Sequence, residues 1–317
     1  MPGVIVIILG IVWVAMKKPL GFEELTASET AVATVVNGQV SPRWFPNLSN
    51  INNLSYLSGI VLLFAGVEVQ AVHASEMENP KKQYPLAIFI SSVIVFALFT
   101  FGSLAIAAVV PNSQLQLESG LMQALSTMLD AVNMKWVLYI LAFCVAFGSL
   151  GGVLSWISGP SKGLLNTAKD GLLPSKLAET TQAGAPKNMM LIQGAIVTVL
   201  ACLYFVMKDV SVAFFLLSAL TVAVYIIMYL MMYMAAIVLR KKQPNMERPY
   251  KAPALKLLAG VGIIAALFAL ALSFVPPAQL PIGHPVSYIS IVAIGTVGFF
   301  VIPLIIVAIR KKKITTS

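Results

Sequence analysis

Residues 56–80, YLSGIVLLFAGVEVQAVHASEMENP, join an apolar run to a strongly polar one. The apolar run from Tyr56 to Val67 has twelve residues, and a helix of that length reaches only about 18 Å. The hydrocarbon core of a bilayer is about 30 Å thick, so this run cannot cross it alone. A crossing segment must therefore carry Glu68 near the bilayer midplane, where an acidic residue costs about 2.5–3.5 kcal/mol. Glu68 is expected to face protein or a water-filled cavity.

The composition indicates a helical membrane protein. Of the 317 residues, 59% are hydrophobic and only 10% are charged, whereas soluble domains carry roughly 25% charged residues. The apolar residues form long runs and do not alternate with polar ones, which favours a bundle of helices over a transmembrane barrel. The net charge of +9 comes largely from Lys and Arg at the ends of these runs, so we expect no nucleic-acid partner.

The apolar runs predict eight spans when each span needs about 20 residues. Together they predict an all-α, polytopic bundle in which residues 1–317 form a single transmembrane domain. The predicted spans cover residues 2–16, 54–77, 85–110, 134–158, 189–207, 212–239, 255–275 and 287–309. The second of them is predicted to be broken. Residues 19–50, 111–133 and 159–188 are expected to be loops.

Basic residues of the connections predict the orientation. They lie after the second, fourth and sixth predicted spans and in the C-terminal tail, at Lys81, Lys82, Lys162, Lys169, Lys176, Lys187, Arg240, Lys241, Lys242, Arg248, Lys251, Lys256 and Arg310–Lys313. If the spans alternate, all these positions fall on one side, which the positive-inside rule makes cytoplasmic. Connection 276–286, on the other side, has no charged residue. We therefore expect a multi-pass protein of the cell membrane with both termini in the cytoplasm.

The break in the second span is expected near Gly66, two residues before Glu68. Two short half-helices that meet at a glycine near the midplane are typical of the discontinuous helices of transporters. The backbone groups freed at such a break can bind the ammonium and carboxylate groups of a zwitterion. An alternative is that Gly66 only permits close helix packing while Glu68 pairs with a cation, but no Lys or Arg lies in the interior of a predicted span.

Three side chains of this segment are candidates for proton coupling: Glu68, His73 and Glu76. Loss of water around Glu68 favours its neutral form, so this carboxyl could take up a proton and link protonation to opening or to substrate release. Alternatively Glu68 stays ionised and holds a substrate ammonium or neighbouring hydroxyls. His73 and Glu76 have a spacing that could ligate a metal, but the chain has only two histidines. We expect no metal site and no cofactor.

Residues 64–87, FAGVEVQAVHASEMENPKKQYPLA, resemble the sixth-helix motif of amino acid permeases of the amino acid–polyamine–organocation superfamily, most closely in the glutamate:GABA antiporter branch. Further similar motifs are 154-LSWISGPSKGLLNTAKDGLLP-174, 219-ALTVAVYIIMY-229 and 248-RPYKAP-253. The resemblance implies a partial leucine-transporter-like fold. It also implies substrate contacts at Phe64, Ala65, Gly66, Val67, Glu68, Ser149, Gly152 and Tyr225. Tyr225 could instead be a packed aromatic, the small residues around Gly152 could serve helix packing, and Trp156 could be an interfacial anchor.

The resemblance covers only the fifth family helix onward, and the family's first broken helix has no counterpart here. Two explanations stay open: a truncated reading frame, or another chain that supplies the first four helices. The resemblance implies secondary active transport of amino acids by alternating access, as glutamate/GABA-like antiport or proton-coupled uptake, and no enzyme activity. The alternative is a non-transporting fragment or membrane subunit. We expect the chain alone not to transport in liposomes.

Overall fold

The computed structural model describes residues 2–23, 33–36, 39–43, 45, 47, 51–69, 71, 74, 77–116, 119–207, 209–248, 250–277 and 285–315. These residues divide into two compact units. The first unit comprises Met1–Leu54 and Ile90–Leu154, and the second comprises Ser55–Phe89 and Ser155–Ser317. Each unit is described by itself below.

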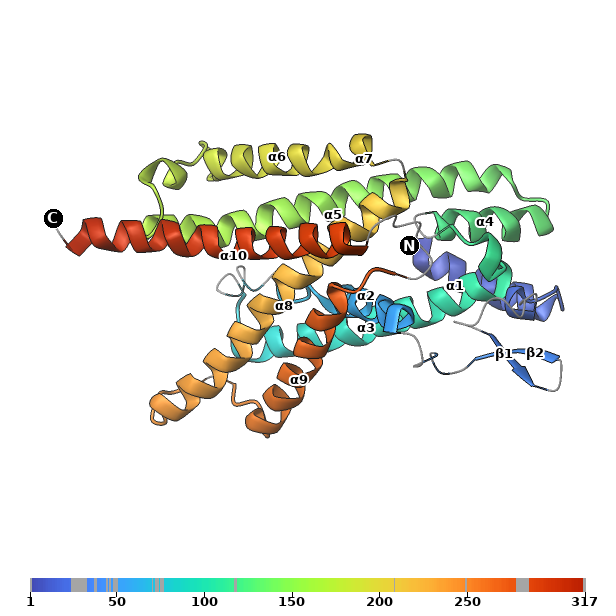
Figure 1. Cartoon of the computed structure of the whole chain (residues 1–317), viewed down its shortest axis with the longest axis horizontal. Coiled ribbons are helices and arrows are strands. Elements are labelled where there is room, and N and C mark those ends of the chain that lie inside the picture. Colours follow the sequence, from blue (N-terminus) through green and yellow to red (C-terminus); the bar gives the residue numbers. More distant parts are fainter. Residues whose placement is uncertain are drawn as a thin grey trace. The chain divides into compact units, whose positions relative to one another are not determined.

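Helices account for nearly all of the regular structure (Figure 1). They are α1 Pro2–Ala15, α2 Tyr56–Phe64, α3 Pro80–Val109, α4 Gly120–Ala131, α5 Trp136–Lys169, α6 Lys187–Ala201, α7 Leu203–Val206, α8 Val210–Lys242, α9 Leu255–Ser273 and α10 Pro285–Thr315. Short 3-10 turns occupy Gly21–Glu23, Ile51–Leu54, Asn112–Gln114 and Ser175–Ala178. Strands β1 (Ala33–Val36) and β2 (Gln39–Pro42) pair antiparallel, with Ala33 opposite Pro42.

Six helical segments of the described chain are long and apolar enough to cross a membrane: Pro80–Val109, Trp136–Lys169, Lys187–Val206, Val210–Lys242, Leu255–Ser273 and Val286–Ile309. They match the third to eighth predicted spans. The first predicted span is helix α1, which has 14 residues, and the second holds the nine-residue helix α2. A polytopic helical membrane protein is therefore confirmed, and the helix within the second predicted span ends at Phe64.

Three segments expected to be loops contain regular structure. The 19–50 segment holds the β1–β2 hairpin, whose Thr34, Val35 and Val40 are the β-branched residues that strands favour. The 111–133 segment holds α4, which has only 12 residues and is therefore too short for a span-length criterion to find. The 159–188 segment begins with the last turns of α5, which continues through Pro160 to Lys169.

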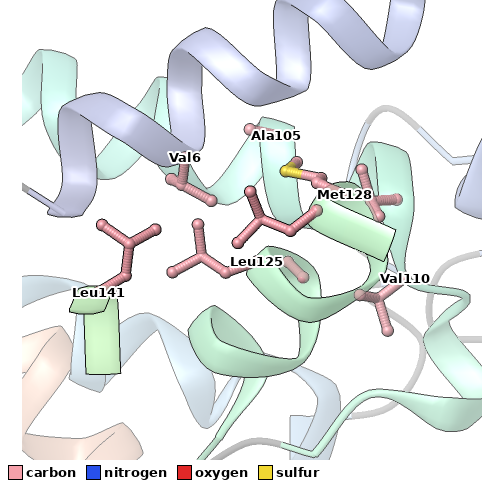
Figure 2. Close-up of a cluster of buried hydrophobic side chains, with 9 residues drawn as sticks. Val6, Ala105, Val110, Leu125, Met128 and Leu141 are labelled. Atoms are coloured by element: carbon pink, nitrogen blue, oxygen red, sulfur yellow. The ribbon is translucent and has the colours of Figure 1, made fainter. Parts of the chain in front are cut away.

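The core of the first unit joins α1, α3, α4 and the start of α5 (Figure 2). Its buried residues are Val6, Ala105, Val109, Val110, Ala124, Leu125, Met128, Leu129 and Leu141. Helix α4 buries side chains at positions 124, 125, 128 and 129, so one face of it is apolar. Helices α1 and α3 meet at Gly10, where an added Cβ would lie 2.6 Å from Cβ of Ala105. A glycine is required there because any side chain would overlap α3.

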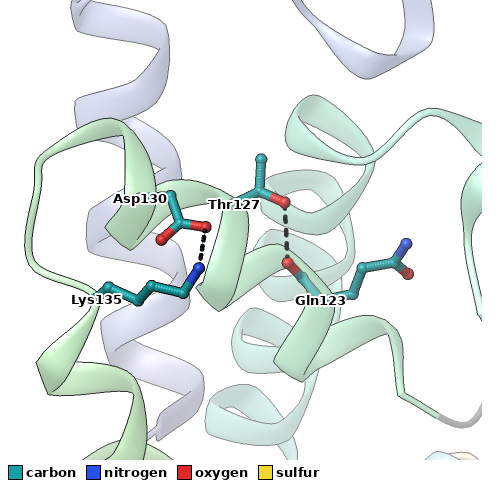
Figure 3. Close-up of polar contacts among 4 residues, drawn as sticks. All are labelled: Gln123, Thr127, Asp130 and Lys135. Carbon is teal, nitrogen blue, oxygen red and sulfur yellow. Dashed lines mark hydrogen bonds and ion pairs between the residues drawn. The ribbon is translucent and has the colours of Figure 1, made fainter.

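Polar contacts lie within α4 and at its C-terminal end (Figure 3). Within the helix, the Thr127 hydroxyl donates to the carbonyl of Gln123 at 3.1 Å. At its end, Lys135 Nζ lies 3.4 Å from Oδ2 of Asp130. Because both charged side chains are exposed, this ion pair stabilises the turn by at most about 1 kcal/mol.

The core of the second unit is built around α8, which packs against α2, α9 and α10. Two glycines bring the neighbouring helices close, as small residues do in membrane bundles. An added Cβ on Gly295 of α10 would lie 2.7 Å from Leu220, and one on Gly262 of α9 would lie 2.8 Å from the Tyr233 ring. Val61 of α2 joins the buried cluster of Val222, Ile226, Ala266 and Ala269. This packing places the end of α2 beside the middle of α8.

Candidate functional site

The centre of the site is the interruption that follows α2. The helix ends at Phe64, and Gly66 adopts a φ of +99°, which L-residues with a side chain rarely adopt. A short turn follows, in which the Val69 N–H donates to the Gly66 carbonyl at 3.1 Å and the Ala71 N–H donates to the Glu68 carbonyl at 2.8 Å. The helix breaks at the predicted glycine.

The Glu68 carboxylate accepts hydrogen bonds from two tyrosines of α8. The Tyr225 hydroxyl donates to Oε1 at 2.9 Å, and the Tyr229 hydroxyl donates to Oε2 at 3.0 Å. The two tyrosines are four residues apart and therefore lie on the same face of the helix. All three side chains are partly buried. The pair of contacts ties the broken span to the middle of α8.

This geometry suits the ionised form of Glu68. A carboxylate is acceptor-only and offers lone pairs on both oxygens, so it can receive both phenol O–H groups at once. Hydrogen bonds to a charged acceptor are roughly twice as strong as neutral ones. A protonated carboxyl must itself donate from one oxygen, which weakens acceptance there. Gain of a proton on Glu68 would therefore loosen one of its two contacts with α8.

Helix α5 packs against the interruption within the same unit. An added Cβ on Gly66 would lie 2.6 Å from Cζ2 of Trp156, and one on Gly159 would lie 2.7 Å from Cγ1 of Val69. The Trp156 ring also meets the Tyr225 ring edge to face, with centroids 5.8 Å apart. One turn of α5 thus contacts both the backbone turn and Tyr225.

An aromatic row extends from this site along α8. The Tyr225 and Tyr229 rings have centroids 5.3 Å apart, and those of Tyr229 and Tyr233 are 6.4 Å apart. Tyr225 was predicted as a site residue, whereas Tyr229, Tyr233 and the contacts of Trp156 were not. The signal was present in 225-YIIMYLMMY-233, where tyrosines repeat every four residues and so must share a face.

The other expected site residues have different surroundings. Phe64 is the last residue of α2 and is exposed, and Ala65 and Val67 flank Gly66 in the turn. Ser149 and Gly152 belong to the first unit. The Ser149 hydroxyl donates to the Val145 carbonyl at 2.9 Å, and a Cβ added to Gly152 would meet nothing within 4 Å. The part in substrate binding expected for these residues stays a prediction.

The proposed proton-coupling residues His73 and Glu76, as well as Gln70, lie outside the described residues. Among the residues that the structure describes, no three His, Cys, Asp or Glu side chains gather into a metal-binding group. Within that part of the chain, the site therefore consists of one carboxylate, phenol hydroxyls, aromatic rings and the backbone of an interrupted helix.

A model of the amino acid permease family matches residues 1–299. An uncharacterized transporter of Legionella pneumophila is 34% identical over 307 residues, which cover 96% of this chain and 63% of the relative. A glutamate/gamma-aminobutyrate antiporter of Lactococcus lactis is 34% identical over 275 residues, covering 84% of this chain and 55% of the relative. A branched-chain amino acid permease of Bacillus subtilis is 25% identical over 221 residues, covering 66% and 43%.

The chain thus spans between 43% and 63% of the length of these three relatives. The matched family is one of transporters, and its model extends over nearly all the helices described above. With six helical segments of membrane-spanning length and composition, the chain is a multi-pass membrane protein. It belongs to the amino acid permease family.

Proposed function

We propose that this chain takes part in the exchange of amino acids across the cell membrane by alternating access, with glutamate and GABA as its first substrates. The observation that carries the proposal is the Glu68 carboxylate, held by Tyr225 and Tyr229 beside a helix that breaks at Gly66. The glutamate/gamma-aminobutyrate antiporter that is 34% identical to this chain supports the choice of substrates.

The interrupted helix supports binding of an amino acid zwitterion. The last carbonyls of α2 have no partners within their own helix, and the C-terminal end of a helix carries a partial negative charge that attracts cations. An ammonium group is therefore favoured near Phe64. The rings of Trp156 and Tyr225 form an apolar wall next to this position, which suits the methylene groups of glutamate or GABA.

The charges of the site favour a substrate without net charge. The described site offers one carboxylate, Glu68, and no Lys or Arg contacts it there. A glutamate anion beside an ionised Glu68 would suffer like-charge repulsion, whereas GABA or glutamate with a neutral side chain would not. We therefore infer that exchange depends on pH through protonation of Glu68, which would remove this repulsion.

Whole cells provide the test, because they supply any further chain that the site requires. A strain without the gene is complemented with the wild-type chain, Glu68→Ala or Glu247→Gln. The last variant removes a carboxylate from an exposed loop and is the matched control. Cells loaded with GABA should take up labelled glutamate only with the wild type and the control.

Three results would change the account. Equal uptake in the strain without the gene would refute the proposed exchange. Uptake of other amino acids in place of glutamate would keep the transport role and refute the substrate assignment. Full uptake by Glu68→Ala would refute the role given to the Glu68 carboxylate.

Proteoliposomes that contain only this chain then test the expectation that another chain contributes to the site. Uptake in cells but not in liposomes would support that expectation.

A further inference from the structure

Helix α5 contains a proline next to the candidate site. Pro160 has no N–H, so the carbonyl four residues before it, that of Trp156, cannot receive the usual helical hydrogen bond. The helix is nevertheless continuous from Trp136 to Lys169. In a membrane an unsatisfied carbonyl is costly, and neighbouring side chains commonly take over such freed groups.

The side chain of Gln193, on α6, bridges the two sides of this proline. Its Nε2 lies 3.5 Å from the Trp156 carbonyl and donates to it. Its Oε1 accepts from the Ser161 hydroxyl at 2.9 Å, and Ser161 is only 2% exposed. The Ser161 contact is the stronger of the two by distance. Both ends of the amide are used, which defines its orientation and joins the residues before and after Pro160.

The segment that Gln193 holds is the one that contacts the interrupted helix. Trp156 lies against Gly66, and Gly159 lies against Val69, in each case too closely for an added Cβ. The same Trp156 ring meets Tyr225. Among these described site residues, Gln193 contacts only the Trp156 carbonyl. Any effect of Gln193 on the site therefore passes through the backbone of α5.

We propose that Gln193 is a positioning residue: its amide replaces the hydrogen bond that Pro160 cannot make and thereby holds Trp156 against the break at Gly66. The claim that the position of the Trp156 ring matters for exchange rests on the proposed function. The claim that Gln193 holds the ring in this position does not. The two claims can accordingly be tested separately.

The test of position uses Trp156 as the only tryptophan of the full-length purified chain, after Trp13, Trp44 and Trp136 are replaced by Phe. Time-resolved fluorescence without substrate then reports the populations of its ring orientations. Gln193→Leu should shift the ratio of these populations by about twofold, the lower end of the range for one hydrogen bond, because the contact with the Trp156 carbonyl is long at 3.5 Å. Thr198→Val is the matched control, because the Thr198 hydroxyl donates only within α6, to Gly194 at 2.9 Å, and should leave the ratio unchanged.

A second substitution tests the mechanism. Pro160→Ala restores an N–H that can donate to the Trp156 carbonyl, so adding Gln193→Leu to Pro160→Ala should produce little further shift. An equal shift in both backgrounds would overturn the proposal, as would a Gln193→Leu ratio like that of Thr198→Val. If Gln193→Leu does not fold, Ser161→Ala takes its place, and a ratio identical to the control then overturns the proposal as well.

Exchange of glutamate for GABA in cells provides the functional readout. Gln193→Leu should lower the exchange rate by about twofold, and the addition of Pro160→Ala to Gln193→Leu should restore it. A normal rate in Gln193→Leu would overturn the role of the amide in the site. Absence of exchange in the wild type would refute the proposed function alone, and the fluorescence result would still decide the proposal about Gln193.

Discussion

The ring of Trp156 leaves no room for a side chain on Gly66: an added Cβ would lie 2.6 Å from Cζ2 of the indole. Gly66 also has a φ of +99°, where L-residues are strained. The two constraints are independent, since one comes from the backbone and the other from a neighbouring helix. Together they make the break at this residue a specific feature of the structure.

We therefore predict that Gly66→Ala destabilises the protein by roughly 1–3 kcal/mol, the range for a strained backbone position, and abolishes exchange. Thermal unfolding of the purified chain measures the first effect and uptake in cells the second. Gly59→Ala is the control: Gly59 lies within α2 and an added Cβ there would meet nothing within 4 Å. A Gly66→Ala protein as stable and active as Gly59→Ala would contradict the account.

The two tyrosine hydroxyls should act together. Tyr225→Phe and Tyr229→Phe each remove one hydrogen bond to a charged acceptor, worth about 1.5–3 kcal/mol when well shielded. Because these side chains are only partly buried, we expect roughly 1 kcal/mol from each, with the double variant less than additive because both donate to one carboxylate. Thermal unfolding checks this. Tyr233→Phe, one turn farther and without a described bond to Glu68, should have little effect, and an equal loss there would contradict the role of Glu68.

Packing of the first unit offers a test that does not depend on function. Leu125 of α4 is 0% exposed at the centre of the cluster in Figure 2. Leu125→Ala should reduce stability by about 2–5 kcal/mol, as in other packed interiors. Leu104→Ala removes the same atoms from a side chain that is 58% exposed and should cost far less. Similar unfolding curves for the two variants would contradict the packing described for α4.

The orientation expected from the basic loops can be tested by cysteine labelling. Cys144 and Cys202 are both exposed, so they are first replaced by Ala. In that background Ala278→Cys should react with an impermeant reagent added to intact cells, whereas Ala183→Cys should react only after the cells are opened. Labelling in the reverse order would place the termini outside.

Most spans were predictable because each is a continuous apolar run. The interruption of the second span was predictable because its apolar run before Glu68 is too short to cross. The break was predictable from Gly66 beside a carboxylate. Helix α4 was not, because its 12 residues carry an apolar face and no apolar run. The predicted span 134–158 ended too early, because α5 continues through Pro160 to Lys169, where Gln193 supplies a donor from another helix. The partners of Glu68 lie 157 and 161 residues away, and a spacing pattern cannot show which helices meet.

The central claim is that the Glu68 carboxylate, held by Tyr225 and Tyr229, is the proton-sensitive group of amino acid exchange. Gain of a proton on Glu68 would weaken one contact with α8, so wild-type exchange should depend on pH. The most direct measurement is the pH dependence of glutamate–GABA exchange in cells that carry Glu68→Gln, whose amide cannot titrate. The account predicts a variant that still binds substrate and exchanges it at a rate independent of pH. A Glu68→Gln variant with the full pH dependence of the wild type would contradict it and direct attention to His73 or Glu76.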